Sequence, residues 1–108
     1  MINPIKIAVD AMGGDNSPNK IIEGISIHEK ESENINYKIF GDESLIKPLI
    51  NKYKVPNNKI QIIHTDKFVD GEDSALSAAK KGKDTSLWLA IKSVKNGESD
   101  VIVSAGNT

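Results

Sequence analysis

The chain has 108 residues, a formal net charge of −1 and no cysteine. Its length favours one domain, and 38% hydrophobic with 27% charged residues is typical of a globular rather than a disordered protein. The composition excludes a long-range attraction to nucleic acid or anionic membrane, disulfides, a thiol nucleophile and thiolate metal sites, and no apolar run approaches the roughly 20 residues of a membrane span.

Four short runs rich in isoleucine or valine predict strands, and helical patterns fall between them. We expect strands at Ile5–Asp10, Asn36–Phe40, Lys59–His64 and Asp100–Ser104, and helices at about Pro18–Lys30, Glu43–Lys54, Ser74–Lys81 and Thr85–Lys95. Regular β-α alternation predicts a parallel sheet with right-handed crossovers. The expected class is α/β, with a three-layer, Rossmann-like, mostly parallel sheet.

The last residues point to a larger unit. Ala105-Gly106-Asn107-Thr108 is typical of a turn into a further helix, and a parallel sheet normally has helices on both faces. We therefore expect residues 1–108 to form a single α/β domain that is the N-terminal portion of a larger catalytic domain, or half of an obligate assembly.

The first predicted strand leads directly into a glycine turn, Asp10-Ala11-Met12-Gly13-Gly14-Asp15, with Pro18 just beyond. Paired glycines let the backbone turn tightly and approach a ligand, and a strand, glycine turn and helix in succession are typical of sites for phosphate or nucleotide groups. The alternative is a plain turn in which Asp15, Asn16 or Ser17 caps the helix. The missing third glycine argues against a dinucleotide fingerprint.

The second candidate is Lys80-Lys81-Gly82-Lys83-Asp84-Thr85-Ser86. Gly82 suits a helix C-terminal cap, and Asp84 or Thr85 suits the N-cap of the next helix. Three lysines beside a helix N-terminus suit an anion-binding site. The alternative, which the pattern by itself favours, is a cluster of solvated lysines that binds no ligand. Because all 14 basic residues are lysine, ammonium groups or backbone amides must meet any anion.

The carboxyl ends of parallel strands share one edge, where ligands of open α/β folds bind. The glycine turn, Gly41-Asp42, Thr65-Asp66 and Ser104-Ala105-Gly106-Asn107 are all expected there. Small residues in the last segment permit close backbone approach, and Asn107 can donate and accept hydrogen bonds; the alternative is again a plain turn. His64 ends a strand near this edge with no partner evident in the sequence, and the carboxylates lack metal-ligand spacing.

With these loops in view, the chain resembles the fatty acyl phosphate synthase family, also called phosphate acyltransferase, of bacterial phospholipid synthesis. The resemblance is carried by Ala8–Asp15 with Pro18, by Lys80–Gly97 and by Val103–Thr108, and it spans the whole chain. The departures are mild: Asp73 stands where proline is common, Thr85 replaces serine and Leu87 replaces methionine.

The resemblance implies a fold like the isocitrate and isopropylmalate dehydrogenases, a homodimer and a considerably longer enzyme. Its implied reaction transfers a fatty acyl group from acyl–acyl carrier protein to inorganic phosphate, giving acyl phosphate without a cofactor or metal. On this basis Lys83 and Asn107 are the expected catalytic residues. The expected phosphate-binding residues are Asp10, Gly13, Gly14, Asp15, Lys80, Ser86, Ser104 and Gly106, among which Asp10 and Asp15 orient the loop or a lysine.

Two other readings stay open. One is a nucleotide- or dinucleotide-using α/β enzyme, which binding of NAD or ATP would reveal. The other is a binding module that takes phosphate or a carrier protein without catalysis. The N-terminus lacks the features of a signal peptide, so the cytoplasm is the expected location, and any peripheral membrane association would use regions outside this chain. The chain alone is expected to be inactive.

Overall fold

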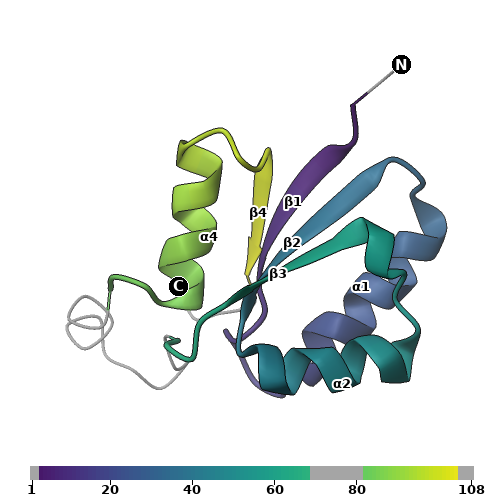
Figure 1. Cartoon of the computed structure of the whole chain (residues 1–108), viewed down its shortest axis with the longest axis horizontal. Coiled ribbons are helices and arrows are strands. Elements are labelled where there is room, and N and C mark those ends of the chain that lie inside the picture. Colours follow the sequence, from purple (N-terminus) through teal and green to yellow (C-terminus); the bar gives the residue numbers. More distant parts are fainter. Residues whose placement is uncertain (1–2, 69–81, 105–108) are drawn as a thin grey trace.

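A computed structural model of the chain describes residues 3–68 and 82–104 and shows an α/β fold (Figure 1). Its strands are β1 (Ile5–Asp10), β2 (Ile35–Gly41), β3 (Ile60–His64) and β4 (Val101–Ser104). All neighbouring strands pair in parallel, in the order β3-β2-β1-β4. The predicted parallel sheet is confirmed, with strand ends shifted by one residue at most.

Helices cover both faces of the sheet. Helices α1 (Asn19–Glu31) and α2 (Glu43–Tyr53) lie on one face, and α4 (Ser86–Lys95) lies on the other, which gives three layers (Figure 1). A single 3₁₀ turn, η1 (Asn57–Lys59), leads into β3. Within the described part of the chain, no helix is long and apolar enough to cross a membrane. The predicted helix at 74–81 lies outside the described residues.

The larger core lies between the sheet and the α1–α2 layer. Val9, Ile22, Ile39 and Ile46 are at most 3% exposed there, because alternate strand residues meet helix residues spaced three or four apart. Burying side chains of this size stabilises a fold by about 1.5–3 kcal/mol each. Leu45 of α2 is instead 48% exposed, because it lies outside the apolar stripe of the helix.

The opposite face carries a smaller core, formed by Ala8, Phe40 and Ala90. Alanines on both β1 and α4 allow the helix to pack closely against the strand. This close packing places the N-terminus of α4 beside the carboxyl ends of β1 and β4, since α4 runs antiparallel to the strands (Figure 1).

The strand order places a topological switch at β1. The chain moves from β1 outward to β3 with helices on one face, then returns to β4 with α4 on the other face. Right-handed crossovers require this change of face when the direction reverses. The switch therefore lies between β1 and β4, and the carboxyl ends of two such strands are the position at which open α/β sheets bind ligands.

Candidate functional site at the carboxyl edge of the sheet

A buried carboxylate organises the switch point. Asp10 ends β1, pairs in register with Ser104 of β4 and is 2% exposed. Its Oδ1 accepts hydrogen bonds from the Ser86 hydroxyl at 2.5 Å and from the Met12 amide at 3.2 Å, and its Oδ2 accepts one from the Ser104 hydroxyl at 2.8 Å. The side chain thus joins β1, α4 and β4, and we call Asp10, Ser86 and Ser104 the buried carboxylate cluster.

This arrangement favours an orienting role for Asp10. Both carboxylate oxygens are occupied by donors of the protein itself, and a second anion placed beside the carboxylate would be repelled. Ser86 is completely buried and donates its hydroxyl hydrogen inward, so its side chain also supports the edge. The structure therefore joins three of the predicted phosphate-binding residues, but in a network that is satisfied internally.

The glycine turn after β1 keeps its backbone close to the sheet. The Ala11 amide donates to the Phe40 carbonyl at 3.0 Å, which extends the ladder beyond β1. Gly13 is buried and its carbonyl accepts the Ser17 hydroxyl at 2.5 Å, while Gly14 has φ +86°, a conformation that side chains disfavour. Helix α1 starts at Asn19 without a side-chain cap, so the alternative in which Asp15, Asn16 or Ser17 caps it is wrong.

The start of α4 is fixed by a second set of hydrogen bonds. Thr85, at 1% exposure, accepts from the Trp88 amide at 3.1 Å and donates to the Gly82 carbonyl at 3.0 Å. The Ser86 amide donates to the Lys67 carbonyl at 2.9 Å. Two of the first three helix amides thus have protein partners, which leaves the helix dipole rather than these amides to attract an anion.

Thr65 ties the end of β3 to this helix start. Its hydroxyl donates to the Asp84 carbonyl at 2.6 Å, and the same oxygen accepts from the Lys67 amide at 3.2 Å. Sequence reasoning placed Thr65 at the edge but assigned it no role. Its position directly after a predicted strand was the available signal, whereas its long-range partner has no sequence signature.

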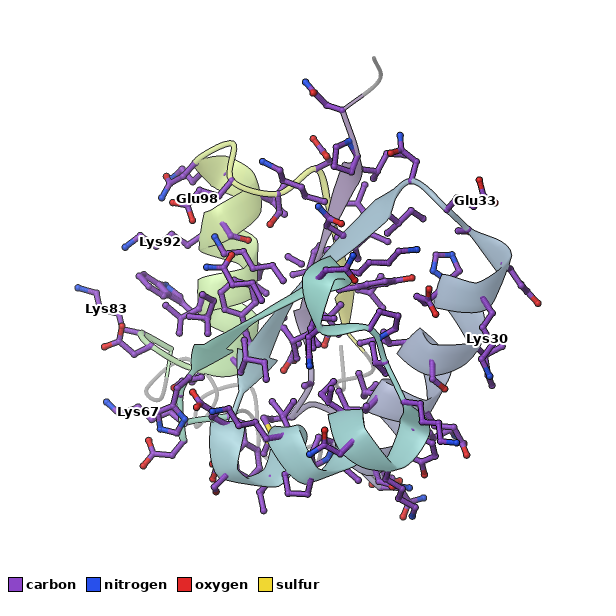
Figure 2. All side chains as sticks on the ribbon, turned by 45° about the vertical axis from the view of Figure 1, so that its right-hand side comes forward. Lys30, Glu33, Lys67, Lys83, Lys92 and Glu98 are labelled. Carbon is purple, nitrogen blue, oxygen red and sulfur yellow. The ribbon has the colours of Figure 1, made fainter. Side chains whose placement is uncertain are left out.

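Two lysines extend from the joined loops toward solvent. Lys83 precedes α4 and Lys67 follows β3, and both are exposed near the carboxyl edge (Figure 2). Lys67 was not singled out in the sequence. Asp15 is exposed in the glycine turn, while Lys80, Gly106 and Asn107 lie outside the described residues.

The side chains of His64 and Asp42 form hydrogen bonds with backbone amides at the start of α2. The His64 Nδ1 accepts from the Glu43 amide at 3.1 Å, and Asp42 Oδ1 accepts from the Ser44 amide at 3.0 Å. Hydrogen bonding from Ser44 lowers the pKa of the Asp42 carboxyl. These groups stabilise a helix terminus, so the geometry gives no support to a catalytic His64.

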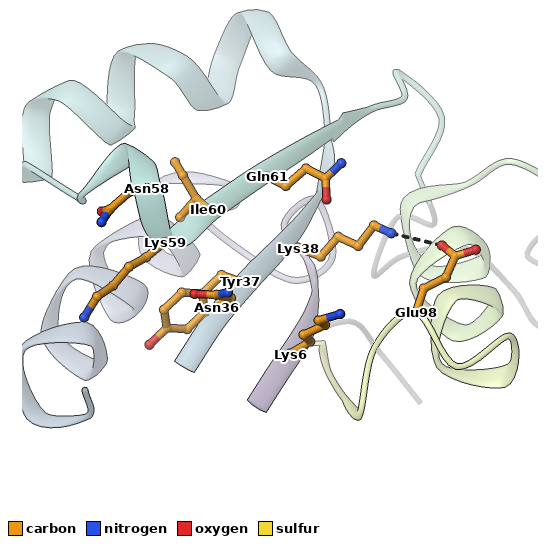
Figure 3. Close-up of a pocket in the computed structure, with 9 residues that line it drawn as sticks. All are labelled: Lys6, Asn36, Tyr37, Lys38, Asn58, Lys59, Ile60, Gln61 and Glu98. Atoms are coloured by element: carbon orange, nitrogen blue, oxygen red, sulfur yellow. Dashed lines mark hydrogen bonds and ion pairs between the residues drawn. The ribbon is translucent and has the colours of Figure 1, made fainter. Parts of the chain in front are cut away.

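A separate hollow of about 340 Å³ lies at the opposite, amino-terminal edge of the sheet (Figure 3). Lys6, Lys38 and Gln61 line it, and the Lys38 ammonium pairs with Glu98 at 2.9 Å. Ligands of parallel sheets bind at the carboxyl edge instead, so this hollow is no part of the candidate site.

Comparison with known proteins gives a consistent result. Residues 5–108 match the family described as fatty acid synthesis protein. The phosphate acyltransferase of Pelagibacter ubique (strain HTCC1062) is 58% identical over 104 residues, covering 96% of this chain and 31% of that protein. Phosphate acyltransferases of Streptococcus sanguinis (strain SK36) and Enterococcus faecalis (strain V583) are 44% identical, covering 95% and 96% of this chain and 30% of each relative.

The chain spans less than a third of the length of these relatives. The matched region contains the glycine turn, the start of α4 and the end of β4, which are the segments that meet at the carboxyl edge. The resemblance predicted from the motifs is therefore confirmed, and the chain belongs to the fatty acid synthesis protein family, with relatives named phosphate acyltransferase.

Proposed function

We propose that this chain is the N-terminal part of an enzyme that transfers a fatty acyl group from acyl–acyl carrier protein to inorganic phosphate. The supporting observation is the 58% identity to a phosphate acyltransferase across the segments that build the carboxyl edge. The product is an acyl phosphate, and the carrier protein is released as a free thiol.

The proposed chemistry needs no protein nucleophile. A phosphate oxygen attacks the thioester carbonyl carbon, a tetrahedral oxyanion forms, and the carbon–sulfur bond breaks to release a thiolate that takes up a proton. Positioning and preorganised positive charge are then the main contributions of the protein. This chemistry suits a chain whose basic residues are all lysine and which has no cysteine.

Each group at the edge has a role in this proposal. Backbone amides of the Gly13-Gly14 turn and of the segment after Ser104 hold phosphate or the oxyanion. Lys83 balances the negative charge from the α4 side of the edge, where Lys67 adds a second ammonium group (Figure 2). Asp10 is a positioning residue, since its hydrogen bonds to Ser86 and Ser104 fix the two segments that flank the turn.

The test compares the chain with a fusion that joins residues 1–108 to the downstream remainder of the Pelagibacter ubique relative. Acyl phosphate formation from palmitoyl–acyl carrier protein and phosphate is measured for both. We expect activity in the fusion only. A folded but inactive fusion would refute the acyltransferase proposal, and titration with NAD and ATP would then examine the nucleotide-binding alternative.

Lys83→Ala in the active fusion tests the phosphate site, with Lys95→Ala at the far end of α4 as the matched control. Loss of a charge contact to an anion is worth about 1.5–3 kcal/mol, so the KM for phosphate should rise by at least about tenfold in Lys83→Ala alone. An unchanged phosphate dependence would show that Lys83 does not contact the anion.

A further inference from the structure

The face of the sheet that carries α1 has an apolar groove beside β4. Ile21, Gly24 and Ile25 of α1 form one wall, and Ile7, Val9 and Val103 of the sheet form the other. We call this the α1–β4 groove. Its cavity volume is about 640 Å³, within the range of about 300–1,000 Å³ that small-molecule sites occupy.

Among the described residues that line the groove, the polar side chains lie at its two ends. Asp15 and Lys20 line it at the carboxyl edge, and His28 and Tyr37 line it at the other end, where the His28 Nδ1 lies 2.6 Å from the Tyr37 hydroxyl oxygen. Between Lys20 and His28, α1 rises by about 12 Å. A long apolar interior that opens on the polar edge of the sheet matches a molecule with an unbranched hydrocarbon chain and a polar head.

The groove continues from the candidate site along the same strands. Val9 directly precedes Asp10, and Val103 directly precedes Ser104, so the groove begins one residue from the buried carboxylate cluster. Successive strand residues face opposite sides, which places these valines on the α1 face and the cluster on the α4 face. A substrate whose reacting carbonyl lies over the carboxyl edge can therefore direct its chain down the α1 face.

The wall formed by β4 is open to solvent. Val101 and Val103 are 47% and 51% exposed, an unusual state for valines of a parallel sheet. A right-handed connection from β4 to a further parallel strand beside it would lie on the α4 face. Such a connection would not itself cover the groove.

From these observations we propose that the α1–β4 groove binds the hydrocarbon chain of the acyl substrate, with the reacting carbonyl at the carboxyl edge. This inference rests on the proposed acyl transfer for the identity of the ligand. The location and the apolar character of the groove come from the structure alone.

Gly24 offers a direct way to fill the groove. A Cβ built at Gly24 meets no atom within 4 Å, so a leucine side chain at this position enters the groove without moving the backbone. Val103→Phe fills the groove from the opposite wall. Glu23→Leu is the matched control, because Glu23 is the exposed neighbour of Gly24 on α1 and does not line the groove.

The experiment measures binding of a fluorescent derivative of palmitate to the fusion protein described above. Displacing as few as two methylenes from an apolar site weakens binding by about tenfold, so Gly24→Leu and Val103→Phe should each weaken binding by at least this factor. Glu23→Leu should bind as the parent does. If the fusion is active, Gly24→Leu should also raise the butyryl-to-palmitoyl ratio of kcat/KM, since a butyryl chain ends before the blockage.

The outcomes separate the two proposals. If the fusion is inactive but Gly24→Leu weakens binding of the palmitate probe, the proposed groove stands and the proposed acyl transfer is refuted. An active fusion whose palmitate binding and chain-length preference survive both filling variants would refute the groove alone. Failure of both variants to fold, seen as loss of a cooperative thermal transition, would show that a protein segment occupies the groove and would also overturn the inference.

Discussion

Removing the Asp10 carboxylate should destabilise the fold because it leaves buried donors without partners. Asp10→Ala deletes three accepted hydrogen bonds, from the Ser86 hydroxyl, the Met12 amide and the Ser104 hydroxyl. Ser86 is fully buried and Met12 is 8% exposed, so water cannot readily replace the carboxylate at these two donors. Each buried unsatisfied donor costs about 1–3 kcal/mol, which predicts a loss of about 2–6 kcal/mol.

A double-mutant cycle isolates the Asp10–Ser86 hydrogen bond. Ser86→Ala removes the hydroxyl, and Asp10→Ala combined with Ser86→Ala removes both partners and one of the unsatisfied donors. Because a hydrogen bond to a charged group contributes about 1.5–3 kcal/mol, we expect a coupling free energy of this size. Ser93→Ala serves as the control, since its hydroxyl is also buried on α4 but bonds to Ala90 and Ser99 instead.

The assay is urea unfolding at neutral pH, followed by far-UV circular dichroism and by the fluorescence of Trp88, two residues after Ser86 in α4. Coincidence of the two transitions establishes two-state behaviour, which the cycle requires. A coupling below about 0.5 kcal/mol, the additivity seen for independent sites, would refute the view that the carboxylate fastens α4 to β1.

Three further predictions concern local structure. Thr85→Ala should lower the free energy of unfolding by about 0.5–2 kcal/mol through loss of the α4 N-cap, and Thr85→Ser should restore most of it in the same urea assay. Gly24→Ala should stabilise the chain by up to about 1 kcal/mol, because alanine has the higher helix propensity and its Cβ meets no atom within 4 Å. Gly41→Ala should destabilise the chain by about 1–3 kcal/mol, because its Cβ would lie 2.8 Å from the Ile46 side chain. Melting temperatures of the two variants equal to that of the parent would contradict both predictions. Burial, with a smaller contribution from Glu29, raises the pKa of the Tyr37 phenol in the folded chain. The unfolded chain therefore loses this proton first, and the free energy of unfolding falls as pH rises above about 10, the pKa of tyrosine in the unfolded chain. The difference in melting temperature between the parent and Tyr37→Phe should narrow above this pH, and a constant difference would contradict the prediction.

Local patterns were sufficient to predict the sheet and the three described α-helices. Isoleucine-rich runs such as Ile60–His64 are too short for helices, and the spacing of Ile22, Ile25 and Ile46, Ile50 sets the buried stripes of α1 and α2. Pro48 lies inside the second helix, α2. The helix continues through it to Tyr53, because tertiary packing of Ile50 outweighs one missing hydrogen bond.

The sequence predicted where the site lies but not the hydrogen bonds that join its residues. Parallel strand order brings Asp10, Ser86 and Ser104 to one edge, and each was named from its own motif. The hydrogen bonds between them join residues 76 and 94 positions apart, and no periodicity or spacing encodes such pairs. The same holds for Thr65, whose partner Asp84 belongs to a different motif.

The internal completeness of the carboxylate cluster restricts which groups can receive an anion. Asp10 accepts hydrogen bonds from both the Ser86 and the Ser104 hydroxyls, and Thr85 and Lys67 accept from two amides at the start of α4. Among the described residues, positive potential at the edge then comes from the α4 dipole, from the exposed Lys67 and Lys83 and from the Gly13-Gly14 backbone. For the proposed acyl transfer to phosphate, neutralising Asp10 in the fusion should reduce activity by displacing these groups, with the phosphate KM and kcat both affected, whereas neutralising Lys83 should act mainly on the phosphate KM.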